Sequence, residues 1–141
     1  MSSTPDVLMS SHDVRVLNGL LFDPAHAAQN DESAADLWGK ILDARVVRPH
    51  AVPADRVRLH STVTYEELPA RTRRTVTLVT PRDANAGQGR ISVLSPIGRA
   101  LLGHARGRVV SVALPIGRHL SVRVLEVSVP APEEVEESVS A

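Results

Sequence analysis

The spacing of the hydrophobic positions changes once along the chain, near residue 57. Before that point, apolar residues recur three or four positions apart in residues 13–22 and 30–46, which is the spacing of amphipathic helices. Capping residues precede both stretches: Ser10 and Ser11 the first, and Asn30 the second, where acidic residues follow in the first turn. Two helices joined by a short connection predict an antiparallel helical hairpin.

After that point, apolar and polar residues alternate, as they do in strands with one buried face. Five such runs are separated by residues that favour turns, and one short helix is expected between the third run and the fourth. The runs are Ser61–Glu66, Thr75–Thr80, Arg90–Leu94, Val109–Leu114 and His119–Val127. The predicted fold class is α+β, with a short N-terminal antiparallel helical hairpin (a short coiled coil) followed by a mainly antiparallel sheet.

Changes in composition divide the chain into parts. Residues 1–9 show no periodicity and are expected to be a disordered lead. Two prolines in residues 48–57 end the second helix and predict a linker. Residues 130–141 are acidic, have no apolar face and are expected to be a disordered tail. The hairpin therefore occupies residues 10–47, and the sheet domain residues 58–129.

Net charge is zero but unevenly distributed. Ten arginines and four acidic residues lie between His60 and Val129, whereas the two ends of the chain are acidic. This arrangement is suited to an anionic partner, and equally to arginines that solvate the outer face of a sheet. Aromatic residues make up only 2% of the chain, which argues against a stacking platform for single-stranded nucleic acid. The chain has no cysteine, no stretch of ~20 apolar residues and no signal pattern, so we expect a cytoplasmic protein.

The most informative stretch is Arg90–Gly103, R-I-S-V-L-S-P-I-G-R-A-L-L-G. Its first residues alternate as a strand does, Ser95 and Pro96 suit the N-cap and first position of a helix, and Gly103 suits a left-handed C-cap. The string resembles the signature of the C-terminal domain of bacterial transcript-cleavage (Gre) factors and of their shorter relatives, the regulators of nucleoside diphosphate kinase. The resemblance extends from about Ser61 to Val127. It implies a sheet domain similar to the FK506-binding-protein (FKBP) fold.

The resemblance also implies a partner, the RNA polymerase core. In this family the C-terminal domain grips the polymerase at the rim of its secondary channel, and the short hairpin would project towards that channel. We therefore expect a bacterial transcription regulator that competes with Gre-type factors, with no cofactor, no sequence-specific DNA binding and no membrane association. The expected polymerase contacts are Asp83, Ser95, Pro96, Ile97 and Arg99.

Two acidic residues near the hairpin tip, Asp31 and Glu32, are the candidates for a role in catalysis. In Gre-type factors, acids at the tip of a long hairpin help to hold a catalytic Mg²⁺. Here neither helix can exceed ~17 residues, or ~25 Å, and acids are favoured at a helix N-terminus for structural reasons alone. We therefore expect a non-enzymatic regulator without cleavage activity. The alternative is a transcript-cleavage factor that acts through these two residues.

No other catalytic or metal-binding pattern is present. The six histidines lack metal-ligand spacing, and no serine lies in a nucleophile elbow. A prolyl isomerase pocket needs several aromatic side chains, and the sheet domain contains only Tyr65. A third alternative is a module with an FKBP-like sheet that binds a small ligand or a peptide.

Overall fold

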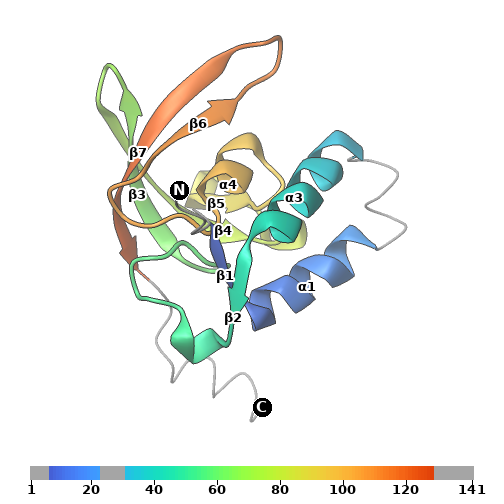
Figure 1. Ribbon diagram of the computed structural model, residues 1–141. Coiled ribbons are helices and arrows are strands. Elements are labelled where there is room, and N and C mark those ends of the chain that lie inside the picture. Colours follow the sequence, from blue (N-terminus) through green and yellow to red (C-terminus); the bar gives the residue numbers. More distant parts are fainter. Residues whose placement is uncertain (1–6, 23–30, 129–141) are drawn as a thin grey trace, which may run out of the picture.

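The computed structural model describes residues 7–22 and 31–128. The N-terminal part contains β1 (Leu8–Ser10), α1 (Ser11–Leu21), α3 (Asp31–Asp43) and β2 (Arg45–Val47), and the two helices run antiparallel as predicted (Figure 1). The Ser10 hydroxyl caps α1 by accepting a hydrogen bond from the Asp13 N–H at 2.9 Å.

A two-stranded parallel pairing at the base of the hairpin was not expected from the sequence. β1 pairs with β2, with Met9 opposite Val46. Leu8 and Met9 of the predicted disordered lead lie in this strand, where Leu8 is half-buried and Met9 is only 2% exposed. The same pairing ends α3 at Asp43, earlier than expected. Residues 1–6 of the predicted lead, the hairpin loop and the predicted acidic tail lie outside the described residues.

The five predicted strands are confirmed and form one sheet in the order β5-β4-β3-β7-β6. They are β3 (Thr62–Leu68), β4 (Thr72–Val79), β5 (Arg90–Ser92), β6 (Val109–Ala113) and β7 (His119–Ser128). The sheet is mixed, since β5 runs parallel to β4 while the other pairings are antiparallel. Short 3-10 turns occur at η1 (Pro49–Ala51), η2 (Pro81–Asp83) and η3 (Ala86–Gln88), and α4 (Pro96–Leu101) is the predicted short helix.

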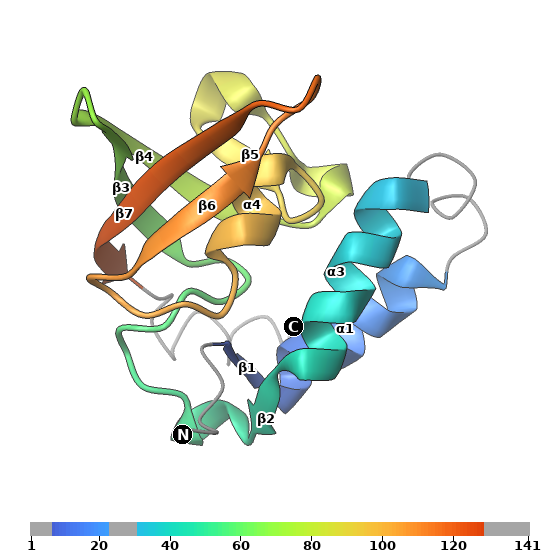
Figure 2. The same ribbon diagram turned by 45° about the horizontal axis from the view of Figure 1, so that its top comes forward.

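The short helix α4 packs against the sheet, the hairpin packs against α4, and all of them share one hydrophobic core. Figure 2 shows α3 between α1 and α4, with the strands on the other side of α4. The core combines fully buried residues of the hairpin, such as Leu17 and Leu37, with Val63 of β3 and Leu101 of α4. The predicted linker thus separates hairpin and sheet in sequence but not in packing, and Val57 within it is 1% exposed. The hairpin thus lies against the sheet domain, mainly through α3 and α4.

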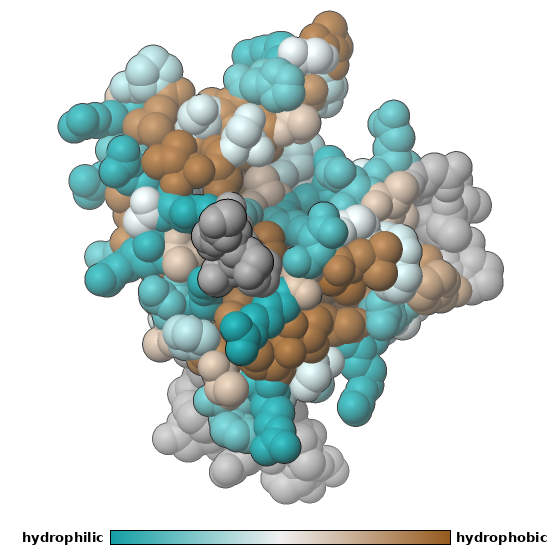
Figure 3. All heavy atoms as spheres, viewed as in Figure 1, coloured by the Kyte–Doolittle hydropathy of each residue, from teal (hydrophilic) through white to brown (hydrophobic). Residues whose placement is uncertain are grey.

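Large apolar side chains also remain exposed on the hairpin. Phe22 is 68% exposed, Leu42 64% and Val46 45%. In the space-filling view, apolar residues gather over α1 and α3 on the face seen in Figure 1 (Figure 3). None of the helices in the described part of the chain is long and apolar enough to span a membrane.

Candidate functional site

The signature stretch forms the strand, junction and helix that its sequence predicts. The Ser95 hydroxyl accepts a hydrogen bond from the Gly98 N–H at 3.2 Å and donates one to the Ser92 carbonyl at 2.6 Å. Pro96 is the first residue of α4, where its missing N–H costs nothing. Gly103 follows the helix with a φ of 86°, the left-handed conformation expected of it.

The start of α4 lies very close to the end of β5. A Cβ at Gly98 would lie 2.2 Å from the Ser92 carbonyl oxygen and 3.0 Å from the Ser95 hydroxyl. Both atoms belong to the capping hydrogen bonds, so neither can withdraw without breaking the junction. Only glycine fits at this position.

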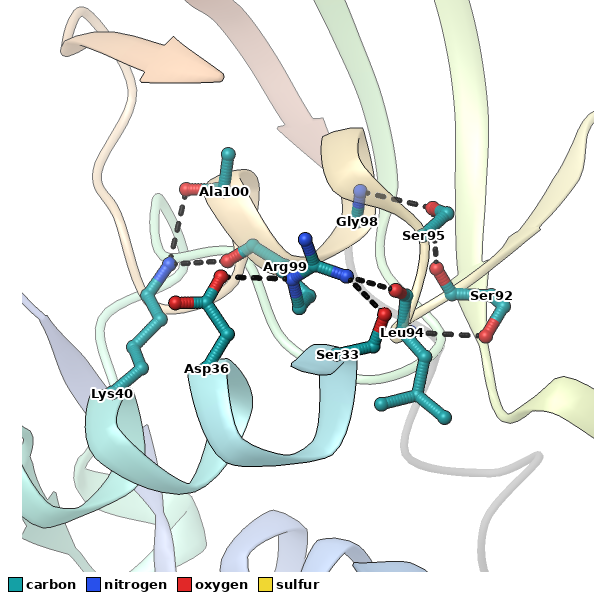
Figure 4. Close-up of polar contacts among 9 residues, drawn as sticks. All are labelled: Ser33, Asp36, Lys40, Ser92, Leu94, Ser95, Gly98, Arg99 and Ala100. Atoms are coloured by element: carbon teal, nitrogen blue, oxygen red, sulfur yellow. Dashed lines mark hydrogen bonds and ion pairs between the residues drawn. The ribbon is translucent and has the colours of Figure 1, made fainter. Parts of the chain in front are cut away.

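Arg99 joins α4 to the hairpin. Its guanidinium donates to the Asp36 carboxylate at 3.0 Å, to the Ser33 hydroxyl at 2.8 Å and to the Leu94 carbonyl (Figure 4). The Arg99 side chain is only 15% exposed. In the structure it is therefore committed to contacts within the chain.

Lys40 makes a second connection between the same helices. Its amine donates hydrogen bonds to the Arg99 carbonyl and, at 3.0 Å, to the Ala100 carbonyl (Figure 4). These carbonyls lie in the last turn of α4, where the helix itself supplies no donors. Burial lowers the pKa of Lys40 to about 7 from its ordinary value of 10.5, while the nearby Asp36 carboxylate acts in the opposite direction.

We expect this lysine to make the protein more stable as pH rises from about 7 towards 10. Over that range the unfolded chain binds a proton at Lys40 that the folded chain does not, so each pH unit adds up to ~1.4 kcal/mol to the free energy of unfolding. A neutral amine still has two N–H groups for the two carbonyls. Urea unfolding at several pH values should show this rise in the wild type and not in Lys40→Met. Equal slopes for the two proteins would contradict it.

Two adjoining hollows run between α3, α4 and the edge strand β6. The first has a volume of about 450 Å³ and is lined by basic residues that include Lys40 and Arg108. The second, of about 680 Å³, is lined by Glu32 of α3, Pro96 of α4 and the apolar Leu114. Hairpin and sheet domain therefore form this groove jointly. Within the described residues, no three histidine or acidic side chains come together as a metal site requires.

The structure brings most of the predicted polymerase contacts together. Ser95, Pro96, Ile97 and Arg99 lie on the junction and α4. Asp83 ends η2, which packs beside β5, and its exposed carboxylate accepts a hydrogen bond from the Thr80 hydroxyl at 3.4 Å.

The two predicted hairpin-tip acids lie in the first turn of α3. Asp31 begins the helix, and Glu32 is exposed and borders the groove. The helices α1 and α3 have 11 and 13 residues. At ~1.5 Å per residue they are ~16 Å and ~20 Å long.

Sequence reasoning missed the polar face of α3 that binds α4. Ser33, Asp36 and Lys40 follow one another at spacings of three and four, so they lie on one side of the helix. That spacing is visible in the sequence, but it looks the same as a solvent-exposed face. Only the position of α4 shows that this face of α3 makes contacts within the chain.

Comparison with known proteins gives consistent matches. Residues 52–129 match the family model described as transcription elongation factor, GreA/GreB, C-terminal. The chain is 35% identical to the transcription elongation factor GreA of Prosthecochloris aestuarii over 104 residues, 72% of this chain and 64% of that one. It is 30% identical to the GreA of Desulfovibrio desulfuricans over 123 residues, 83% of this chain and 76% of that one.

A solved structure matches as well. The prokaryotic transcription elongation factor GreA/GreB from Nitrosomonas europaea is 33% identical, with a TM-score of 0.68 over 89% of this chain and 99% of that one. The likeness therefore includes the hairpin as well as the sheet.

Proposed function

The chain belongs to the GreA/GreB family of transcription elongation factors, and from this membership we propose that it regulates transcription by binding RNA polymerase. The observation that carries the proposal is the signature element, whose cap, glycine and C-terminal turn are all formed. The chain spans 64% of the length of the Prosthecochloris relative, so its activity as a whole is part of the proposal.

The docking surface that we propose is the junction at Ser95 and Pro96, together with Ile97 and the exposed Asp83. It would bind at the rim of the polymerase's secondary channel, in the bacterial cytoplasm, and so compete with longer Gre-type factors. Arg99 has a different role in this proposal. Because its guanidinium is held by α3 and the Leu94 carbonyl, it positions α4 rather than contacting the polymerase.

We propose further that the protein does not stimulate transcript cleavage. The short helices and their packing against the sheet domain support this, since they limit how far Glu32 can reach into a channel. Such a protein would act like the regulators of nucleoside diphosphate kinase. The second candidate is cleavage through Asp31 and Glu32, and the kinship with proteins named transcription elongation factor GreA favours it.

Two measurements test these proposals. The first is co-migration of the protein with core RNA polymerase, with and without a competing cleavage factor. Binding that the competitor displaces is expected, and no binding at micromolar protein and low salt would overturn the proposal. The second adds the protein to stalled elongation complexes. Unchanged transcripts are expected, whereas shortened transcripts that Glu32→Ala abolishes would establish the second candidate.

Reversing the charge at Asp83 should weaken polymerase binding without unfolding the protein. We expect Asp83→Arg to lower affinity roughly tenfold, because a charge at the edge of an interface acts mainly on association. Its exposed side chain makes one long hydrogen bond, so the thermal midpoint should not move. Asp55→Arg, at another exposed aspartate, is the control. Equal affinities for the two variants would remove Asp83 from the docking surface.

A further inference from the structure

An exposed apolar stripe runs along the outer side of the hairpin. It consists of Phe22, Trp38, Leu42 and Val46, and the rings of Phe22 and Trp38 meet edge to face with centroids 5.4 Å apart. Three of the four residues are more than 40% exposed. Large apolar side chains that gather in this way on a small protein mark an interaction surface.

Helical geometry places the stripe at the seam between the two helices. On α3, Trp38 and Leu42 each follow a core residue by one position, which is ~100° around the helix. Phe22 follows the core residue Leu21 of α1 in the same way. In an antiparallel pair of helices, the same one-residue offset from the core turns the two sets of side chains either towards each other or away from each other. The contact between Phe22 and Trp38 shows that they turn towards each other.

Two glycines lie beside the stripe, one on each helix. Gly19 of α1 and Gly39 of α3 are in helix interiors, where glycine is less stable than alanine. A Cβ at either position would meet no atom within 4 Å. Nothing within the described part of the chain therefore requires glycine at these two positions. They leave hollows next to large exposed side chains. Such hollows are typical of a surface that another backbone approaches closely.

The charges beside the stripe differ between the helices. Arg15 lies four residues before Gly19 on α1, and Asp43 lies four residues after Gly39 on α3, and both are exposed. Neither takes part in an ion pair among residues 7–22 and 31–128. One edge of the stripe is therefore positive and the other negative.

We propose that this stripe binds the same stripe of a second copy of the chain, forming a symmetric dimer of hairpins. A two-fold interface places one patch against itself, so the patch must carry both the projections and the hollows that receive them. Here the side chains of Leu42 and Phe22 are the projections, and the hollows at Gly19 and Gly39 are the places where those of the second copy would pack. Packing α1 of one copy along α3 of the other also brings Arg15 of each copy to the Asp43 edge of its partner.

The dimer would have a consequence for polymerase binding, which rests on the function proposed above. Pairing covers the outer face of both hairpins, including Leu42. A hairpin that is covered in this way cannot enter a channel. Dimer formation would then compete with any polymerase binding in which the hairpin enters the channel, and protein concentration would set the fraction of chains that are free to enter it.

Analytical ultracentrifugation of the full-length protein tests the dimer with no polymerase present. Between ~5 and ~500 µM, the range for modest interfaces, the average mass should rise from one chain towards two. Leu42→Glu should weaken association at least tenfold. Gly39→Gln should do the same by filling the hollow. Its thermal midpoint should be no lower than that of the wild type, because a Cβ at this position meets no atom within 4 Å and glutamine favours a helix more than glycine does.

The matched control is Ile116→Glu. Ile116 is 95% exposed at the turn between β6 and β7 and is not part of the stripe, so this variant should associate as the wild type does. Three results would overturn the proposal: a single-chain mass at every concentration, association that Leu42→Glu and Gly39→Gln leave intact, or equal loss in Ile116→Glu. If Leu42→Glu instead impaired polymerase binding by a protein that stays monomeric, the stripe would belong to the polymerase.

Discussion

Replacing Gly98 with alanine is expected to lower the free energy of unfolding by about 3 kcal/mol, the upper end for an overpacked site. The added methyl group would lie 2.2 Å from the Ser92 carbonyl oxygen, which is backbone and cannot rotate away. Relief requires α4 to move off β5, and that breaks the hydrogen bonds of Ser95 to Gly98 and Ser92. Thermal unfolding should show a midpoint roughly 10 °C lower.

The matched control for this change is Gly19→Ala. Gly19 is also in a helix, but a Cβ there meets nothing within 4 Å. At protein concentrations low enough for single chains, alanine should therefore stabilise the protein by about 1 kcal/mol through helix propensity. If Gly98→Ala unfolds at or above the wild-type temperature, then the junction is looser than the structure describes. Polymerase binding by Gly98→Ala at low temperature would show whether a distorted junction still docks.

Local chemistry explains why the signature element could be predicted from its sequence. Ser95, Pro96 and Gly103 act through hydrogen bonds and backbone angles within a few residues of themselves. The alternation that predicts each strand likewise depends on neighbours in sequence. The strand positions were therefore correct to within a few residues, whereas nothing local reveals that β5 runs parallel to β4.

Long-range packing explains what the sequence left hidden. The pairing of β1 with β2 joins residues almost forty positions apart, and three-residue strands carry too short a pattern to be recognised. The link from Arg99 to Asp36 spans 63 residues. Charged residues at helical spacing look like a solvated face until another helix covers them. Arg99 was accordingly expected to contact a partner, and the structure places it between α3 and α4.

Family membership and hairpin geometry support different parts of the function. The match over residues 52–129 concerns the domain that we propose to dock, whereas the cleavage question depends on what α1 and α3 can reach. The contacts of Arg99 and Lys40 with α3 tie these two parts together. If the hairpin moves with α4 as one body, docking fixes where the acids at the start of α3 point.

Reversing the charge of Arg99 should therefore damage the fold itself. Arg99→Glu removes three hydrogen bonds and places a second carboxylate beside Asp36, at a position where the native side chain is only 15% exposed. Removing one partner of a well-buried pair costs ~3–5 kcal/mol, and because the Asp36 side chain is 67% exposed we expect about 2 kcal/mol here. Urea unfolding measures this loss. Polymerase binding should fall together with stability. In Asp83→Arg, by contrast, affinity should fall while stability stays the same.

A charge exchange separates loss of the ion pair from loss of packing. In Arg99→Glu with Asp36→Arg, the two side chains can pair again in reversed order, so about 1 kcal/mol of stability should return relative to Arg99→Glu alone. Asp36→Arg alone should destabilise, because it sets two guanidinium groups against each other. Equal stability of the double variant and Arg99→Glu would mean that the Leu94 carbonyl and the Ser33 hydroxyl, not Asp36, hold Arg99 in place. Recovery would show that the hairpin is held on α4 by charge.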